Sequence, residues 1–263
     1  MRKPILVILA LIAGISVAND GGLASGGSPR LLNSHPSIRM ESELILIKIR
    51  DGKVTTKCQF TFVNTGKACD VVMGFPDKGF GEKDNFGQSG EYWKDWKVAS
   101  VFDAFSYWVN GKQSKTSLIK GKVAGEVFQA KKVQFGAKAT VKVRDVYVMN
   151  EGGTVTDMGR TTARCTGYIL ATGASWKGNI GSTTVVIEFD PAKPMKEMKY
   201  GTEKQFENFN FVKEFKDPLS AVRCRGPVKP VLANNKLTFS IKNWRPTKSS
   251  DIYLEYHSDI GQE

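Results

Sequence analysis

The feature that most constrains the fold is a period-two alternation of apolar residues, which recurs along most of the chain. Residues 44–49 carry isoleucine at every second position, and residues 54–63 repeat the pattern with Cys58, Phe60 and Phe62 on one face. Between these two segments lies Asp51-Gly52, which is a strong short-range signal for a hairpin turn. Because side chains of a strand point alternately to opposite faces, this pattern predicts two paired, half-buried strands.

Similar segments follow downstream, and they are separated by turn-forming residues. Asn110-Gly111 is a second hairpin signal of the same type. Further strands are predicted at residues 69–75, 105–109, 127–133, 139–148, 165–171, 183–189, 236–241 and 252–256. Residues 191–218 permit either an irregular helix or an extended crossover. We therefore predict an all-β protein, an antiparallel β-sandwich with little helix, and not the strand–helix alternation of nucleotide-binding folds.

Glycine-rich stretches suggest how the chain is divided. Gly152, Gly153 and Gly159 mark a boundary between a first sandwich lobe at residues 31–150 and a second at residues 160–263. Residues 19–30 are rich in small residues and are predicted to form a flexible lead-in.

The first 18 residues are expected to stand outside the fold. Arg2 and Lys3 precede an apolar run at residues 5–17, and Ser16-Val17-Ala18 offers the small residues that a signal peptidase reads. A membrane-spanning helix needs about 20 apolar residues, so a cleaved signal peptide is favoured over a retained anchor. No later segment is apolar enough to cross a membrane. We expect an exported protein, periplasmic or extracellular, without a transmembrane segment.

Basic residues outnumber acidic ones by 38 to 26, which gives a formal charge of +12. The surplus consists of dispersed lysines, among them Lys131, Lys132, Lys138 and Lys142, and no arginine-rich run indicates a nucleic-acid partner. Solvated sheet faces, with lysines protecting the edge strands, are one interpretation. The other is long-range attraction to an anionic envelope polymer or membrane surface.

The cysteine count favours structural cross-links. An even number of cysteines in an exported protein is typical of disulfides, and four allow three pairings. We predict Cys58–Cys69 and Cys165–Cys224, because each pair stays within one half of the chain. A zinc site is not expected, since the chain has no C-x-x-C and only two histidines.

Recognisable catalytic motifs and cofactor fingerprints are missing, so we expect neither a cofactor nor a metal. A serine triad would have to use His257, which lies in a terminal segment. A hydrolase needs two acids that meet in space; Asp103, Asp145 and Glu188 are candidates that nothing distinguishes from surface acids. A non-enzymatic binding or structural role is therefore predicted, with a carboxylate-pair hydrolase as an alternative.

Three aromatic residues in a long, glycine-rich segment are the best candidates for ligand contact. Tyr92, Trp93 and Trp96 could stack against sugar rings, which would make the protein a glycan-binding module. The alternative is that these rings fold back and seal one end of the sandwich. The partners that these alternatives suggest are an envelope polysaccharide or another envelope protein.

A glycine-rich string at residues 172–181 surrounds Trp176. Gly173, Gly178 and Gly181 permit tight turns, and we expect Trp176 to fill the gap between the sheets. Together with Met73-Gly74-Phe75-Pro76, this string resembles a family of exported bacterial proteins catalogued as a domain of unknown function. The resemblance implies export and a β-rich fold, and it brings no site residues.

Overall fold

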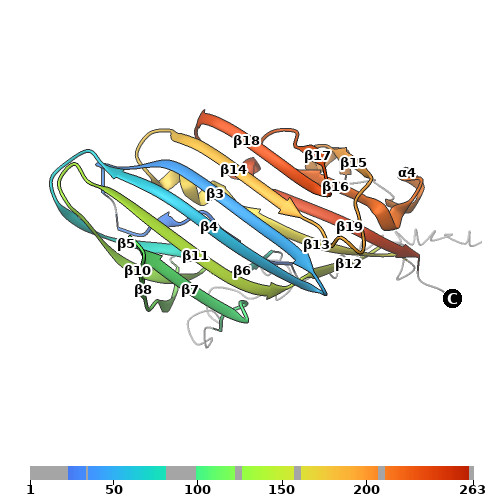
Figure 1. The fold of residues 1–263 in the computed structure, drawn as a ribbon, viewed down its shortest axis with the longest axis horizontal. Helices are drawn as coiled ribbons and strands as arrows, with labels where there is room; N and C mark the ends of the chain where they lie inside the picture. The colour runs from blue at the N-terminus through green and yellow to red at the C-terminus, as the bar shows by residue number, and fades with distance from the viewer. Residues whose placement is uncertain are drawn as a thin grey trace, which may run out of the picture.

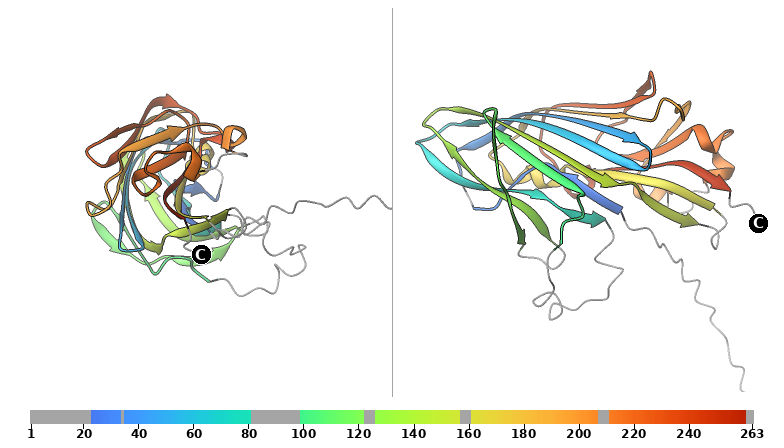
Figure 2. Two further views of the ribbon diagram at one scale, coloured as in Figure 1. Left: turned by 90° about the vertical axis from the view of Figure 1, so that its right-hand side faces the viewer. Right: turned by 60° about the horizontal axis from the view of Figure 1, so that its bottom comes forward.

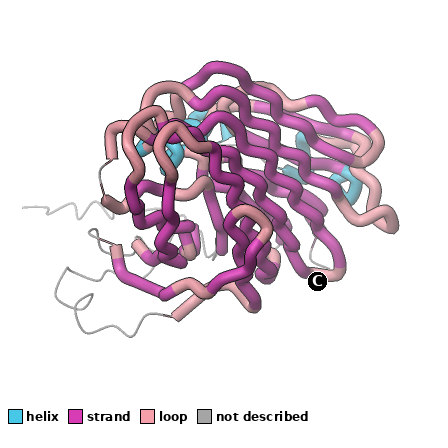
Figure 3. Tube along the Cα trace, turned by 60° about the vertical axis from the view of Figure 1, so that its left-hand side comes forward, coloured by secondary structure: helices cyan, strands magenta, loops and turns pink. Residues whose placement is uncertain are grey.

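The computed structural model describes residues 23–33, 35–80, 99–121, 126–156, 161–206 and 211–260. Strands dominate these ranges, and the helices within them are turns of three to five residues (Figure 3). The turns are η2 (Ala171–Ser175), α3 (Glu203–Phe206), α4 (Phe211–Glu214), η3 (Pro218–Ser220) and η4 (Lys248–Ser250). The predicted all-β class is confirmed.

The largest of three sheets has eight strands and contains both predicted hairpins (Figure 1). Its order is β17 (Val231–Ala233), β18 (Lys236–Trp244), β14 (Ile180–Glu188), β3 (Ile38–Arg50), β4 (Lys53–Asn64), β11 (Thr140–Asn150), β7 (Ala104–Val109) and β8 (Lys112–Ser114). All neighbours are antiparallel except β14 and β3. Asp51 and Gly52 both have positive φ, at 52° and 74°, and so do Asn110 and Gly111. The two turns therefore form as their sequences predict.

The other two sheets complete the sandwich. The seven-stranded sheet has the order β15 (Glu197–Tyr200), β16 (Ala221–Arg225), β19 (Ile252–Ile260), β13 (Thr161–Ile169), β1 (Leu23–Gly27) and β6 (Lys78–Phe80), with β12 (Gly152–Thr156) paired to β13. The four-stranded sheet has the order β2 (Arg30–Leu31), β5 (Cys69–Pro76), β10 (Val127–Phe135) and β9 (Ser117–Lys120). Within residues 191–218, the described parts (191–206 and 211–218) combine the two predicted alternatives, an extended strand and short helical turns.

The eight-stranded sheet packs against both smaller sheets, and all three enclose one interior (Figure 2). The ring centroid of Phe62 on β4 lies 6.4 Å from that of Phe135 on β10. Phe189, which follows β14, lies 5.5 Å from Tyr256 on β19. The four-stranded sheet thus covers one end of the large sheet, and the seven-stranded sheet covers the other (Figure 1).

The predicted division into two lobes does not match this arrangement. Strand β14, from the predicted second lobe, pairs with β3 from the first over residues 182–188. Strand β1 likewise pairs with β13. Because β3 is apolar on much of both faces, it suits the middle of a sheet, where it takes one neighbour from each half of the chain.

The predicted flexible lead-in at residues 19–30 is also wrong where the structure describes it. Residues 23–27 form β1, and a Cβ added at Gly26 would lie 2.6 Å from the Tyr147 ring. At Gly27 it would lie 2.5 Å from the Ile169 backbone. These glycines therefore permit close packing rather than flexibility. The predicted signal peptide at residues 1–18 lies outside the described residues, and within those residues no helix has the length and hydropathy to cross a membrane.

Trp176 occupies the predicted place between the sheets. Only 2% of it is exposed, and its Nε1 donates a hydrogen bond of 2.6 Å to the Pro29 carbonyl. Its ring lies 4.5 Å from that of Phe62. Of the three glycines in this string, Gly178 has positive φ, at 66°. The string is thus a structural plug.

Candidate binding site

The aromatic residues that sequence reasoning favoured for ligand contact, Tyr92, Trp93 and Trp96, lie outside the described residues. Their role in glycan binding stays a prediction, and the candidate site described below comes from other parts of the chain.

The predicted disulfides are not present, and all four cysteines are free thiols. The Cys69 Sγ lies 3.9 Å from the Asn64 Nδ2. Asn64 is six residues along β4 from Cys58, a distance of about 20 Å, whereas a disulfide needs Cα atoms within about 7 Å. Proximity within one half of the chain, on which the predicted pairing was based, does not set the positions of two cysteines along their strands.

The second predicted pair is separated by a strand. Cys165 on β13 lies opposite Glu255 of β19, and Cys224 on β16 lies opposite Leu254. Because consecutive residues of a strand point to opposite faces, the two thiols lie on opposite sides of the seven-stranded sheet. Burial raises the pKa of Cys224 to about 12, which favours an inert thiol there.

The three acids proposed for a hydrolase are not brought together. Asp103 forms an exposed ion pair with Lys53 at 2.8 Å. Glu188 lies 3.1 Å from Lys236, and this contact lowers its pKa. Asp145 is buried inside the sandwich. Each of these acids therefore has its own cationic partner, and they form no common cleft. The imidazole of His257 contacts the Leu219 carbonyl at 2.5 Å.

A buried ion pair joins the eight-stranded and four-stranded sheets, which the sequence analysis missed. Lys131 on β10 contacts Asp145 on β11, and neither side chain is exposed. Burial raises the pKa of Asp145, and the charge of Lys131 opposes this shift. The period-two alternation of β11 does predict a buried Asp145, because Asp145 shares the face of Val143 and Tyr147, which point to the core.

A second buried carboxyl group lies in the same interior. Glu43 on β3 accepts hydrogen bonds from Ser28 Oγ at 2.6 Å and from Thr183 Oγ1 at 2.8 Å. Desolvation by burial raises its pKa from 4.5 to about 7, although both hydrogen bonds oppose the shift. Thr183 Oγ1 also accepts a hydrogen bond of 2.8 Å from Trp244 Nε1. This network therefore connects the interior to Trp244, which lines a surface pocket.

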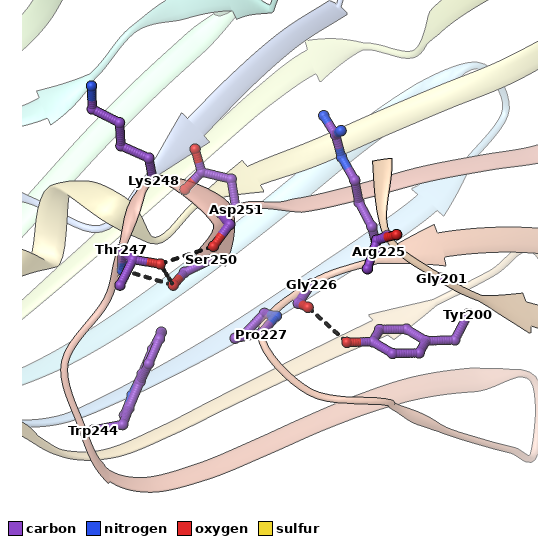
Figure 4. Close-up of a pocket in the computed structure, with 12 residues that line it drawn as sticks. Tyr200, Gly201, Arg225, Gly226, Pro227, Trp244, Thr247, Lys248, Ser250 and Asp251 are labelled. Atoms are coloured by element: carbon purple, nitrogen blue, oxygen red, sulfur yellow. Dashed lines mark hydrogen bonds between the residues drawn. The ribbon is translucent and has the colours of Figure 1, made fainter. Parts of the chain in front are cut away.

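That pocket is the best-formed candidate site, with a volume of about 410 Å³. It lies where β15, β16 and β18 end, so residues distant in the sequence meet there. Figure 4 shows the η4 residues on one side and Tyr200 with Arg225 on the other. The residues whose chemistry matters are Tyr200, Thr202, Arg225, Trp244, Lys248 and Asp251.

The two aromatic side chains of the pocket are held in place by hydrogen bonds. The Tyr200 hydroxyl donates to the Gly226 carbonyl at 2.8 Å, and Trp244 is fixed through Thr183 as described above. Both residues are half-buried. Because the hydrogen bonds fix their orientation, they offer preformed apolar contact to a ligand.

The charged groups of the pocket give it a positive character. The Arg225 guanidinium lies 5.0 Å from the centre of the Tyr253 ring, and Lys248 is exposed. The Asp251 Oδ1 accepts hydrogen bonds of 2.8 Å from the backbone amides of Leu170 and Ala171. Since those amides engage Asp251, it offsets the two cations less than an unengaged carboxylate would.

The sequence analysis did not predict this pocket. Its lining comes from four segments that meet only in the folded chain. Trp244 and Thr247 belong to Asn243-Trp244-Arg245-Pro246-Thr247, and Asn243 has positive φ, at 47°. The sequence offered one local signal for this site, which was the aromatic Trp244 directly after Asn243, a residue type that tolerates positive φ.

Comparison with known proteins supports the fold. No protein-family model matches the chain, and no curated protein matches it. A solved Legionella pneumophila protein with a proposed nutrient-binding role is 24% identical, with a TM-score of 0.60, over 89% of this chain and 71% of that chain. The fold is therefore shared with that protein.

Two enzymes show weaker likeness. An M1 zinc metallopeptidase from Deinococcus radiodurans is 9% identical, with a TM-score of 0.37, over 85% of this chain and 43% of that chain. Leukotriene A4 hydrolase from Saccharomyces cerevisiae is 8% identical, with a TM-score of 0.42, over 86% of this chain and 30% of that chain. Likeness at this level carries no argument about activity.

Proposed function

We propose that this is a non-enzymatic binding protein whose pocket at the ends of β15, β16 and β18 holds a small organic anion. The observation that carries the proposal is the pairing of two fixed aromatic side chains, Tyr200 and Trp244, with two cations, Arg225 and Lys248. A carboxylate or phosphate would pair with the cations, while the apolar part of the ligand packs on the rings. A protein of the same fold with a proposed nutrient-binding role accords with this function.

The chemistry of the lining favours binding over turnover. The described lining residues include no histidine or cysteine, and their one carboxylate, Asp251, accepts two backbone hydrogen bonds. A general base or nucleophile has to be available for a proton or a bond. Asp251 is instead used to hold the η2 segment against β19.

A ligand screen tests the proposal. Small carboxylates, phosphorylated compounds and neutral sugars are added to the full chain, and the thermal midpoint Tm is measured. Organic anions should raise Tm, because a ligand that binds only the folded state stabilises it. Calorimetry on the best compound should then show binding that is weakened roughly tenfold by Lys248→Gln, the loss of one charge-assisted contact.

Lys229→Gln is the matched control, because it removes the same charge from another exposed loop position outside the pocket lining. It should leave the affinity within about twofold. Stabilisation by neutral sugars alone, or an equal loss in both variants, would contradict an anion site at this pocket.

Two expectations from the sequence stand beside this proposal as separate hypotheses. We propose that the chain is exported, with residues 1–18 as its signal peptide. We also propose that Tyr92, Trp93 and Trp96 contact an envelope polysaccharide. A glycan array probed with the native chain and with Trp93→Ala and Trp96→Ala tests the second hypothesis, which fails if binding is the same in all three.

A further inference from the structure

The outward face of the eight-stranded sheet has a composition that the pocket does not explain. Alternate residues of β3, β4 and β11 face the core, so the residues between them face solvent. Apart from Arg39 and Lys53, which pair with exposed acids, these three strands carry five cations on this face: Lys48, Arg50, Lys57, Lys142 and Arg144. Four of them are exposed, and Arg144 is half-buried.

Acidic side chains compensate this charge only at the margins. Glu188 on β14 contacts Lys48 at 3.9 Å and Lys236 at 3.1 Å. Glu41 forms its own ion pair with Arg39 at the start of β3. Among the described residues, Lys57, Lys142 and Arg144 form no ion pair with an acidic side chain. A strip of uncompensated positive charge therefore crosses the middle of the sheet.

In two outward rows, strand register places polar, uncharged side chains beside the cations Lys142 and Arg144. Ser42 on β3 lies opposite Thr61, and Thr61 lies opposite Lys142. In the next outward row, Gln59 on β4 lies opposite Arg144. Hydroxyl and amide groups both donate and accept hydrogen bonds. These two rows thus combine cations with groups that can bind sugar hydroxyls.

One hollow on this face holds a pre-oriented arginine. Its volume is about 300 Å³, and its lining includes Gln59, Trp108, Lys142 and Arg144. The Arg144 guanidinium lies 3.9 Å from the centre of the Trp108 ring. Its Nε is buried with no hydrogen-bond partner among the described residues. Stacking on the ring holds the planar donor group in a fixed orientation, which suits recognition of a carboxylate or sulfate.

We propose that this outward face binds an extended acidic polysaccharide, with Arg144 and Lys142 engaging its anionic groups and Gln59 and Thr61 its hydroxyls. Single-stranded nucleic acid fits less well, because base stacking uses several aromatic side chains and this hollow offers Trp108 alone. A lipid surface also fits less well. The apolar residues of this face, such as Leu46 and Val146, are half-buried, and the exposed large apolar side chains of the described residues, Leu219 and Val231, lie outside β3, β4 and β11. Interfacial binding instead uses exposed apolar residues, which it buries in the lipid.

Binding to immobilised polygalacturonate tests the proposal. The full chain is compared with a triple variant, Lys57→Gln, Lys142→Gln and Arg144→Gln. A control triple, Lys204→Gln, Lys216→Gln and Lys229→Gln, makes the same charge change at exposed positions outside the eight-stranded sheet. Removing three cations should weaken binding at least tenfold at about 0.1 M salt, and the control should stay within about threefold. Circular dichroism checks that both variants are folded.

Other probes separate this proposal from its competitors. Neutral dextran should not bind, and added salt should weaken polygalacturonate binding, because the contacts are exposed. Equal losses in the two triple variants would overturn the proposal, since net charge alone would then explain binding. Tighter binding to phosphatidylglycerol vesicles or to single-stranded DNA than to polygalacturonate would also overturn it. The Lys248→Gln variant should bind polygalacturonate normally, which keeps this face distinct from the pocket.

Discussion

The two faces of β3, β4 and β11 treat charge in opposite ways, although neighbouring residues of the same strands form them. On the inner face, Glu43 and Asp145 are buried, and each has fixed partners. On the outer face, Lys57 and Lys142 are exposed and have no acidic partner among the described residues. A single step along β11, from Asp145 to Arg144, therefore separates a charge that organises the core from one that lies on the outer face.

Burial, and not residue type, therefore decides what a charge does in this fold. A buried ion has lost its hydration, so removing its partner leaves an uncompensated charge. An exposed ion keeps its hydration and costs little when it is replaced.

Lys131→Met should destabilise the protein by about 3–5 kcal/mol, because it leaves the Asp145 carboxylate buried without its cation. The neighbouring Lys132 is exposed, so Lys132→Met should change the free energy of unfolding by less than about 0.5 kcal/mol. Urea unfolding of both variants measures the difference. Similar values would mean that Lys131 is not a structural cation.

Replacing the whole pair sharpens this test. If the cost comes from an unpaired charge, Lys131→Met combined with Asp145→Leu should be more stable than Lys131→Met alone, by at least about 2 kcal/mol. A double variant that is no more stable than the single one would instead assign the cost to lost packing around Tyr107, whose ring centre lies 4.9 Å from Lys131 Nζ.

Glu43 should make stability depend on pH. Its pKa is raised from 4.5 to about 7 in the folded protein, so folding favours its protonated form. This contribution is fully present below the unfolded-state pKa near 4.5 and is lost as the pH rises toward 7. The loss amounts to roughly 3 kcal/mol. Unfolding free energies measured between pH 4.5 and 8 should show the fall.

Glu43→Gln should abolish this component of the pH dependence, because its amide does not ionise. Glu41→Gln is the control, since Glu41 lies two residues away, is exposed and pairs with Arg39. It should retain the pH dependence of the native chain. A native profile that is flat between pH 5 and 7 would show that the Glu43 pKa is not raised.

Much of the fold could be predicted from local patterns, because alternation and two-residue turns act over short distances. The Asp51-Gly52 hairpin and the buried face of Cys58, Phe60 and Phe62 follow from sequence in this way. The order of strands in the sheets could not be predicted from local patterns, because the pairing of β14 with β3 joins residues about 140 apart in the sequence. A glycine-rich stretch between strands carries no information about such long-range pairing.

The candidate site was less predictable than the fold for a related reason. Lys131 and Asp145 were interpreted as surface groups from their residue type, although their parity pointed inward. The pocket is built from the ends of three strands and one short turn, so no single segment contains it. The position of a charged residue in the period-two alternation can show that it is buried before a structure is known. A site assembled at strand ends can be predicted only when the order of the strands in the sheets is known.

Two tryptophans, Trp176 in the core and Trp108 on the outer face, extend the comparison to neutral side chains. Trp176→Phe should cost about 1–3 kcal/mol, because it leaves the buried Pro29 carbonyl without its hydrogen bond. Trp108 is half-buried on the outer face, so Trp108→Phe should cost less than about 1 kcal/mol. Thermal and urea unfolding compare the two, and equal costs would show that the outer-face ring also has a structural role.

Removing cations from the outer face should have the smallest effect on the free energy of unfolding, and the sign of this effect is informative. Lys57 and Lys142 lie among cations of the same sign, so Lys57→Gln with Lys142→Gln should raise the free energy of unfolding by up to about 0.5 kcal/mol at low salt. Near 0.5 M salt the gain should disappear, because screening already removes the repulsion between exposed charges. A loss above about 1 kcal/mol would instead place these lysines with Lys131 as structural cations. Stability gained by removing the two cations would favour a ligand-binding role for them, since the folded chain does not need their charge.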